Sequence, residues 1–553
     1  MLSSQGCLTA RRRCLLIAFL TLLTNANGLQ AAEELGVRVP DDFEVVQFAG
    51  DDLAHDIFSM TIDSRGRVVV AGPGYVKILI DQDGDGKADV ARLFSESPQN
   101  GAQGMFFHGN SLLCIGDAGL LRYRDEDEND QADGPPDVFL KTKTGGEHDL
   151  HSIQQGPDGW WYVIAGNLAG ITEKYATLPS SPIQQPRAGV IFRLKPDLSG
   201  GEILSHGLRN AYDFAFNGQG DLFTYDSDEE REVSLPWYRP TRVFHSMIGA
   251  DHGWVSKSWI RPDGAFDMPP IVAPLGRGSP SGVVCYRHQQ FPSKYHDSLF
   301  VLDWTYGRIH ALPLSSQGET WSTEPELFMS GTGQNGFAPT DIDVGPDGSL
   351  FVSIGGRGTR GGVYRVRYAP QVRQDSETVT VPNRRLEEGL SAVLDAPQPL
   401  SSWSRSRWVP QARKLGSQPF EQASLDEQLP VANRLRAIEV LTELFGGMDA
   451  ALLHRLGDSS CHEVRARAIW AYGRASAGRR DVDMLQRYLN DKDPQVRRCT
   501  LEMCLSDFER SLDWTPLLPG LAQILGGADR YSRALAAAIV SRLDEKYIAP
   551  VSL

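Results

Sequence analysis

Hydrophobic and polar residues recur in one pattern between residues 58 and 368. In each copy, a turn containing Gly, Asn or Asp precedes a short apolar run, which is the signal of a β-hairpin. The six copies begin near Ile62, Phe107, Gly156, Asn217, His296 and Gly345. Further apolar strands follow several of them, for example at 189–194 and 362–366. Four strands per unit, repeated six times, predict an all-β six-bladed β-propeller over residues 36–368.

Length and composition support a multidomain protein that begins with β structure. A chain of 553 residues exceeds the size at which one hydrophobic core stops growing, so two or more domains are expected. The 55 Gly, 33 Pro and 11 Trp residues indicate many turns and aromatic strands. A β-sandwich also uses short strands, but it does not reuse one turn-plus-strand unit six times.

The periodicity changes after residue 368. Residues 369–430 are rich in Pro, Ser, Gln and Arg without a sustained period, and they are predicted to form a linker. From there to the C-terminus, apolar residues follow helical spacing, as in Leu435, Ile438 and Leu441. An Arg-Ala-Ile phrase and an Asp-rich turn leading into Val-Arg both recur in this region. Residues 431–553 therefore resemble HEAT repeats, and they are predicted to be a platform for a protein partner or a lid that docks without one.

The N-terminus has the residue order of a secretory signal. Arg11, Arg12 and Arg13 precede an apolar run at 14–23, and small residues follow. The apolar run is too short to span a bilayer. We therefore expect a signal peptide over residues 1–32 and a periplasmic or secreted protein, with an uncleaved membrane tether as the alternative.

Charge and cysteine content exclude two kinds of function. A net charge of −15 opposes a phosphate backbone, and no Lys/Arg stripe follows the N-terminus, so no nucleic-acid partner is expected. Two of the seven cysteines lie in the predicted signal, and the others have no disulfide-framework spacing. No Cys-x-x-Cys-His motif occurs, so the chain has no covalent haem site of its own.

Two acidic loops have the spacing of a cation-binding loop. Oxygen-bearing side chains recur at alternate positions, and Gly86 supplies the tight turn of the first loop. The predicted Ca²⁺ ligands are Asp81, Asp83, Asp85, Lys87 and Asp89 in the first loop and Asp125, Asp127, Asn129 and Asp133 in the second. Arg92 stands where a sensor loop has a bidentate Glu, and Asp130 replaces the turn glycine, so structural sites on the blades are expected. The alternative is a pair of solvated acidic turns.

Two groups of residues are candidates for catalysis or cofactor binding. His148 and His151 precede a blade strand, where the loops of a propeller converge on one end of the channel. A neutral imidazole there can accept a hydroxyl proton. Arg209, before the fourth blade strand, offers a planar cation suited to a carboxylate or a developing oxyanion.

Two further segments concentrate charge. The carboxylates within 226–229 must bind a cation, pair with arginines or face water. The Gly-rich loop at 355–362 carries Arg357 and Arg360, and it combines backbone freedom with two guanidinium groups. This loop is predicted to hold an anionic ligand, with a closing turn of the last blade as the alternative.

These residues together resemble a known family. His148 before a Gly-Pro-Asp turn, followed by Gly207-x-Arg209-Asn210, is similar to the order in glucose/sorbosone dehydrogenases, six-bladed propellers that bind pyrroloquinoline quinone and Ca²⁺. The wider sequence is closer still to planctomycete-type membrane-bound dehydrogenase domain proteins, which often add HEAT repeats. The motifs that carry this similarity lie at 148–152, 226–229, 236–243 and 355–366.

The resemblance implies a role for each candidate residue. His148 would be the general base, and Arg209 would stabilise the charge that develops on the quinone. The other implied cofactor contacts are Asn167, Asn210, Arg357 and Arg360. Asn167 stands where the dehydrogenases have a carboxylate that orients the histidine, and an amide holds a tautomer without stabilising an imidazolium by charge. Asp228 lies in the segment where the family holds Ca²⁺ largely through backbone oxygens.

Two functions are therefore expected. The first is oxidation of a sugar or polyol hydroxyl by hydride transfer to pyrroloquinoline quinone, with electrons passing to a separate acceptor such as a cytochrome c. The second is a non-catalytic propeller that binds carbohydrate or protein, with the helical repeats as an interaction platform. Convergence of His148, Arg209 and the loop arginines in one cavity would favour the first, and scattered positions would favour the second.

Overall fold

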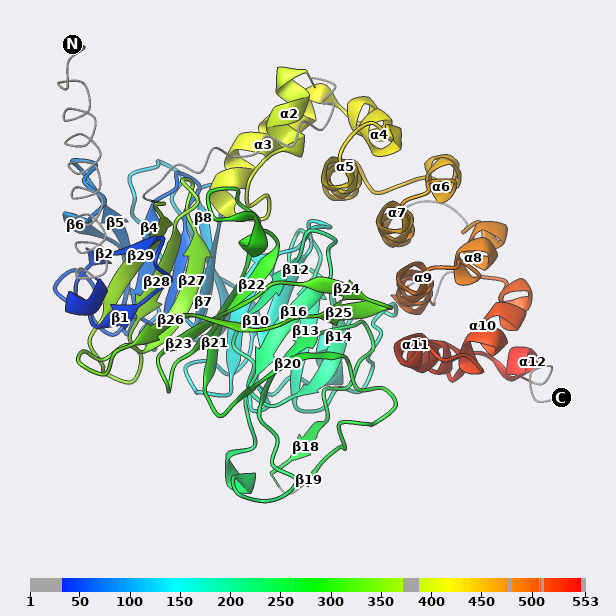
Figure 1. The fold of residues 1–553 in the computed structure, drawn as a ribbon, viewed down its shortest axis with the longest axis horizontal. Coiled ribbons are helices and arrows are strands. Elements are labelled where there is room, and N and C mark those ends of the chain that lie inside the picture. Colours follow the sequence, from blue (N-terminus) through cyan, green and yellow to red (C-terminus); the bar gives the residue numbers. More distant parts are fainter. Residues whose placement is uncertain are drawn as a thin grey trace, which may run out of the picture.

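The computed structural model describes residues 32–257, 259–370, 387–475, 480–506, 508 and 512–548. It shows a six-bladed β-propeller with an arc of helices beside it (Figure 1). Residues 1–31 of the predicted signal lie outside the described residues. In the described part of the chain, no helix is long and apolar enough to cross a membrane.

Six antiparallel sheets form the blades, and each blade runs from an inner strand outward. The first three blades are β3 (Ser59–Ile62), β4 (Val68–Gly72), β5 (Tyr75–Ile80) and β6 (Val90–Ser95); β7 (Gly104–His108), β8 (Ser111–Gly116), β9 (Gly119–Arg124) and β10 (Asp137–Lys141); and β11 (Leu150–Gln155), β12 (Trp161–Ala165), β13 (Gly189–Leu194) and β14 (Gly201–Leu208). The next two are β15 (Phe214–Phe216), β16 (Leu222–Asp226), β17 (Thr241–His245) and β20 (Ile271–Gly276); and β21 (Pro280–Tyr286), β22 (Ser298–Asp303), β23 (Arg308–Leu312) and β26 (Glu326–Gly331). Two small hairpins extend from them, β18 (Trp254–Ser256) with β19 (Trp259–Ile260) and β24 (Ser315–Gln317) with β25 (Thr320–Ser322).

The last blade closes the ring with a strand from the N-terminal end. Its inner strands are β27 (Pro339–Val344), β28 (Leu350–Ile354) and β29 (Gly362–Tyr368), and its outer strand is β2 (Phe43–Ala49). Phe43 pairs with Tyr368, so the two ends of the propeller sequence lie in one sheet. A short strand, β1 (Val37–Arg38), also pairs with β26. The six-bladed propeller predicted from the repeated turns is confirmed.

The middle strands of the blades are buried on both faces, which explains their continuous apolar sequences. Every residue of β4, β12 and β28 is buried, whereas the outer strands β6 and β10 are largely exposed. A middle strand packs against both neighbouring blades, so hydrophobic residues are favoured at all its positions.

Short 3₁₀ helices occur at Glu173–Tyr175, Glu230–Glu232, Ser293–Tyr295 and Thr515–Leu517.

Helices begin earlier than the sequence predicts. Residues 388–425, predicted as linker, form α2 (Glu388–Leu394), α3 (Ser402–Leu415) and α4 (Gln418–Leu425). Trp403 and Trp408 are buried on α3, so this segment packs despite its polar composition. Pro410 inside α3, together with the many Ser and Arg residues, conceals the helical period.

The later helices stack as an inner and an outer row (Figure 1). The inner row is α5 (Val431–Leu444), α7 (His462–Arg474), α9 (Pro494–Ser506) and α11 (Arg530–Val540). The outer row is α4, α6 (Ala450–Gly457), α8 (Val482–Leu489) and α10 (Leu518–Leu525), and α12 (Glu545–Ile548) ends the described chain. The pairing is consistent with a helical-repeat array, and the HEAT type remains a prediction.

The inner row of helices docks on the hairpin turns of the propeller. Arg474 of α7 bonds Asp158, and Arg498 of α9 bonds Asp221, in contacts of 2.9 Å that are buried at the junction. Arg467 lies so close to the turn at Gly220 that a Cβ there would stand 1.8 Å from its guanidinium. These turns lie at the opposite end of the blades from the loops that carry Arg209 and Arg357. The helical region therefore covers the face opposite the candidate site.

Candidate functional site

One cavity of about 220 Å³ opens at the loop end of the propeller channel. Residues of all six blades line it, from the segments that lead into inner strands and from the loops that follow second strands. Of the predicted site residues, Arg209, Asn210 and Arg357 line this cavity. Trp304, directly after β22, supplies an aromatic wall beside them. The cavity thus gathers two guanidinium groups, an amide and an indole.

Arg209 is held by its neighbours in a turn between β14 and β15. Its guanidinium donates a 2.8 Å hydrogen bond to the hydroxyl of Ser227 and lies 3.5 Å from the carboxylate of Glu230. Its side chain is 16% exposed, whereas Glu230 is 60% exposed. Because one partner is neutral and the other is solvated, the cation is weakly neutralised. It therefore remains available for an anionic ligand.

Arg357 reaches the cavity from the loop between β28 and β29. Its guanidinium lies 5.2 Å from the centre of the Trp304 ring and 2.6 Å from the carboxylate of Glu147. Its backbone has a φ of 59°, an uncommon conformation for a residue with a side chain, set by the Gly-rich loop. The indole of Trp304 donates to the carbonyl of Gly355, so the aromatic wall and the arginine loop are joined.

His148 and Asn167 form a separate pair at the edge of this cavity. His148 Nδ1 lies 2.5 Å from Asn167 Oδ1, so the amide oxygen accepts the Nδ1 proton and leaves the Nε2 lone pair free. The backbone N–H of Asn167 donates to the carbonyl of Arg209, which ties this pair to the arginine turn. Neither residue lines the cavity, so the expected convergence of His148, Arg209 and the loop arginines is met only for Arg209 and Arg357.

The second histidine of the motif is a structural residue. His151 is fully buried, and its ring stacks on Tyr212 with centroids 3.8 Å apart. Burial lowers the pKa of His151 to about 4, so the ring is neutral at pH 7. Tyr212 in turn forms part of the cavity floor. Tyr212, Ser279 and Ser281 line the cavity without having been predicted, and their shared position at one end of the blade strands is the signal that would have found them.

Two other predicted residues lie elsewhere. Arg360 donates to the carbonyl of Gly336 and to the hydroxyl of Tyr364, away from the cavity lining. Asp228 is buried and accepts a 2.6 Å hydrogen bond from the Tyr238 hydroxyl. Neither residue contributes to the walls around Arg209.

The donors of the cavity fit a planar polycarboxylate such as pyrroloquinoline quinone. Arg209 and Arg357 match carboxylates, and Trp304 offers a flat surface. Asn210 Oδ1 is buried and has no hydrogen-bond partner among the described residues, although Asn210 lines the cavity. A buried acceptor without a donor is costly, so a ligand that donates there would satisfy it.

The two acidic loops adopt the same conformation on neighbouring blades. Carboxylate oxygens of Asp81, Asp83 and Asp89 come within 4.8 Å of one another in the β5–β6 loop. Asp125, Asp127 and Asp133 do the same in the β9–β10 loop. In both loops the first aspartate accepts backbone N–H groups from residues three to five positions later. The carboxylate of Asp85 lies outside the first cluster and accepts the backbone N–H of Lys87 at 2.8 Å, and the side-chain amide of Asn129 donates to Asp127 of the second cluster at 2.9 Å. Lys87 and Asn129 as ligands remain predictions.

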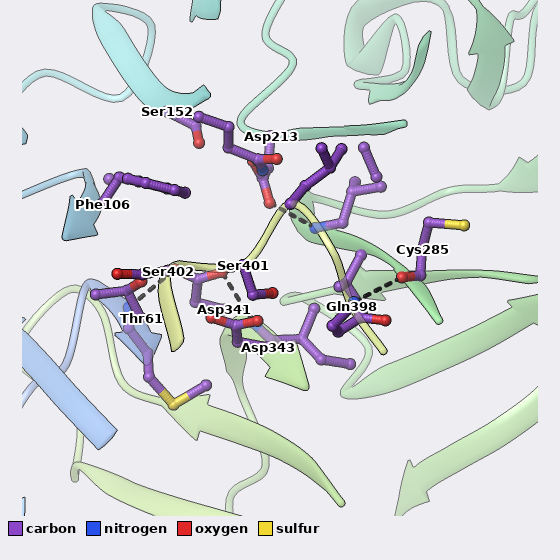
Figure 2. Close-up of a pocket in the computed structure, with 18 of the residues that line it drawn as sticks. Thr61, Phe106, Ser152, Asp213, Cys285, Asp341, Asp343, Gln398, Ser401 and Ser402 are labelled. Carbon is purple, nitrogen blue, oxygen red and sulfur yellow. Dashed lines mark hydrogen bonds between the residues drawn. The ribbon is translucent and has the colours of Figure 1, made fainter. Parts of the chain in front are cut away.

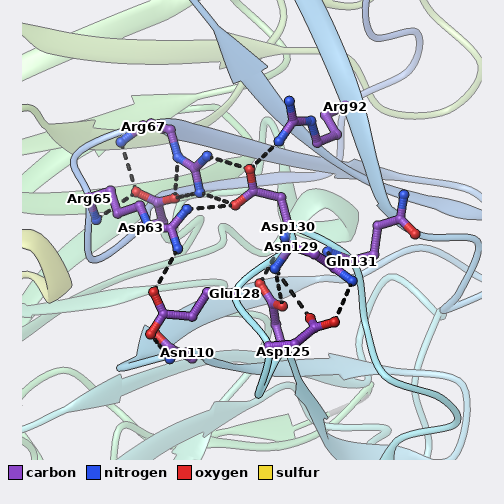
Figure 3. A network of polar contacts seen from close by, with 11 residues as sticks. Asp63, Arg65, Arg67, Arg92, Asn110, Asp125, Glu128, Asn129, Asp130 and Gln131 are labelled. Atoms are coloured by element: carbon purple, nitrogen blue, oxygen red, sulfur yellow. Dashed lines mark hydrogen bonds and ion pairs between the residues drawn. The ribbon is translucent and has the colours of Figure 1, made fainter.

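Asp130 occupies the turn position of the second loop, where the first loop has Gly86 (Figure 3). Its φ is 68°, and its carboxylate is bonded by Arg65, Arg67 and Arg92. These arginines lower the pKa of Asp130 against the effect of burial. The ion pairs offset the strain of the left-handed backbone. Arg92, at the twelfth position of the first loop, thus joins it to the second.

A second, lower cavity of about 90 Å³ lies along the same channel (Figure 2). It contains Asp213, Asp341 and Asp343, whose carboxylates accept backbone N–H groups from inner strands. Burial raises the pKa of Asp213 to about 6 and that of Asp343 to about 7, and it also raises that of Asp341. Residues 398–402 of the helical region lie across its lower end.

The fold and the cavity define a six-bladed propeller with a cavity at its loop end that is lined by two arginines. The family described as a domain of unknown function, DUF7133, matches residues 31–353, and the chain belongs to this family. No curated protein matches the chain.

Several solved structures are similar to the propeller. An oxidoreductase described as a glucose dehydrogenase from Thermus thermophilus is 20% identical, with a TM-score of 0.45, over 59% of this chain and 99% of its own. The quinone-bound aldose sugar dehydrogenase of Streptomyces coelicolor is 16% identical, with a TM-score of 0.43, over 60% and 99%. The quinone domain of a Coprinopsis cinerea pyranose dehydrogenase is 14% identical, with a TM-score of 0.45, over 60% and 97%.

Proposed function

We propose that the protein is an exported dehydrogenase that oxidises a hydroxyl group of a sugar or polyol at the upper cavity, with pyrroloquinoline quinone as its cofactor. The observation that carries the proposal is the convergence of Arg209, Arg357, Trp304 and the unsatisfied Asn210 on one cavity. The quinone, when bound, supplies a two-electron acceptor for the hydride of the carbinol carbon. Electrons then pass to a separate acceptor such as a cytochrome c, because the chain carries no haem motif.

The residues of the chain divide the work between binding and proton transfer. Arg209 and Arg357 would hold the anionic groups of the cofactor, and Trp304 would offer it an aromatic surface. His148 takes the substrate hydroxyl proton at Nε2, since Nδ1 is occupied by Asn167. Asn167 holds the tautomer but supplies no charge to the imidazolium, so the base is weaker than one paired with a carboxylate.

The acidic loops serve stability in this proposal. Each loop binds one Ca²⁺ through the carboxylates that already converge, and the ions stiffen two adjacent blades. Both loops lie on outer hairpins, remote from the strand ends that carry the cavity.

Reconstitution tests the activity. Purified protein is titrated with pyrroloquinoline quinone and Ca²⁺, followed by absorbance, and then assayed on a panel of sugars and polyols with an artificial electron acceptor. We expect saturable quinone binding and turnover, with His148→Ala lowering turnover by about 100-fold or more while leaving quinone binding intact. His454→Ala is the control, because that histidine is exposed in the helical region.

The non-catalytic alternative gives a different result. A propeller that only binds carbohydrate would retain sugars without quinone absorbance or turnover, and the His148 variant would bind them equally well. Turnover that survives in His148→Ala would show that another group takes the proton.

A further inference from the structure

Asp226, at the end of β16, lies directly behind the cavity wall. It is 1% exposed, and its carboxylate accepts three backbone hydrogen bonds. Asp226 Oδ2 accepts from the N–H of Arg209 at 2.9 Å. Asp226 Oδ1 accepts from the N–H groups of Asn210 at 2.7 Å and Ser227 at 2.9 Å. All three donors belong to residues that line the upper cavity.

The residue type matches this arrangement. A carboxylate has two oxygens that only accept, so one side chain can satisfy three converging donors. An amide in the same place would turn one oxygen into a donor facing an N–H group. Both oxygens of Asp226 are therefore occupied by backbone N–H groups, an arrangement that differs from the arginine pairing the sequence left open for segment 226–229.

A second buried carboxylate supports the same turn from the other side. Gly207 has a φ of 79°, and a Cβ there would stand 2.2 Å from Asp251 Oδ1. Asp251 is 2% exposed and is bonded by Arg187 and Arg261. The turn that carries Arg209 therefore lies between two buried carboxylates, those of Asp226 and Asp251, and hydrogen bonds hold both of them.

We infer that Asp226 is the positioning residue of the upper cavity, which sets the backbone of Arg209, Asn210 and Ser227 so that their side chains are preorganised for the ligand. The inference rests on the proposed use of this cavity as the cofactor site. Asp226 touches no ligand itself and acts through the three amides. Preorganisation of this kind lowers the cost of ordering the site on binding.

Asp226→Asn tests the inference in the full-length protein. Hydrogen exchange of the amides of Arg209, Asn210 and Ser227 is expected to accelerate about 10-fold, and the Kd for pyrroloquinoline quinone is expected to rise about 10-fold or more. The pH dependence of turnover should stay unchanged, because Asp226 bonds backbone N–H groups of the turn, whereas Nδ1 of His148 is bonded by the Asn167 side chain.

The matched control is Asp63→Asn. Asp63 is also buried, and it accepts backbone N–H groups from Arg65 and Arg67 at 2.9 Å, but it lies in a hairpin on the opposite face. This variant should accelerate exchange locally and leave the Kd for the quinone unchanged.

Two results would overturn the inference: unchanged amide exchange in Asp226→Asn, or an equal rise of the quinone Kd in both variants. If the wild-type protein binds no quinone, the proposed function fails. The amide exchange of the two variants still decides whether Asp226 holds the turn.

Discussion

The junction between the propeller and the helices depends on Arg498, and its replacement by methionine is a sharp test of the docking. Arg498 is 2% exposed and bonds both oxygens of Asp221, at 2.9 and 3.1 Å, and Glu502 at 3.1 Å. Burial raises the pKa of Asp221, but Arg498 and His245 lower it overall, so the carboxylate is charged at pH 7. Removing the cation leaves a buried charge largely uncompensated, which costs about 3–5 kcal/mol.

The assay is the free energy of unfolding from denaturant titration, followed by tryptophan fluorescence and circular dichroism. Arg497→Met is the adjacent control, since its partner Asp529 is 37% exposed and such a pair contributes below about 1 kcal/mol. Adding Asp221→Asn to Arg498→Met should recover part of the loss, because it removes the unpaired charge. A loss below about 1 kcal/mol for Arg498→Met would refute the reasoning, as would equal losses for the two arginines.

Three other changes have defined outcomes. Chelation of Ca²⁺ should lower the midpoint of thermal unfolding, and a variant with Asp83→Asn and Asp127→Asn should be insensitive to the chelator; equal sensitivity would contradict the loop sites. The raised pKa of Asp343, about 7 against about 3.9 in an unfolded chain, means that the folded state keeps a proton that the unfolded state loses between pH 4 and 7. The free energy of unfolding should therefore fall by about 2–4 kcal/mol as pH rises through this window. In Asp343→Asn, denaturant titration at each pH should show a smaller dependence of this free energy on pH. Asn167→Asp should raise turnover by about 10-fold or more, because a carboxylate stabilises by charge the imidazolium that forms on His148; unchanged turnover would contradict His148 as the base.

Repeated local signals made the propeller predictable. Each blade uses a turn with Gly, Asn or Asp and a buried apolar strand, and both are readable within ten residues. The position of Arg209 and Arg357 in one cavity was predictable for the same reason, because loops at one end of the blades converge. The resemblance to dehydrogenases added roles for these residues, and the geometry at Asn210 supports a ligand there.

Contacts between residues distant in the sequence could not be predicted from it. Asp226 and Arg209 are separated by a hairpin, so the hydrogen bonds between them depend on the register of β15 and β16. The helices at 388–425 could not be predicted from an apolar period, because what orders them is burial of Trp403 against the propeller and of Trp408 against the other helices. The position of Arg360 in the Gly-rich loop did not reveal the direction of its side chain, which bonds the carbonyl of Gly336 and does not line the cavity.

Residues 398–402 lie across the lower end of the channel, where Gln398 donates to the carbonyl of Cys285 and the indole of Trp403 donates to the carbonyl of Val344. The helical segment therefore packs on the end of the propeller opposite the loops that carry Arg209 and Arg357. Under the proposed function the two ends of the channel would have separate uses, because the loop end would admit the ligand and the other end would anchor the helices.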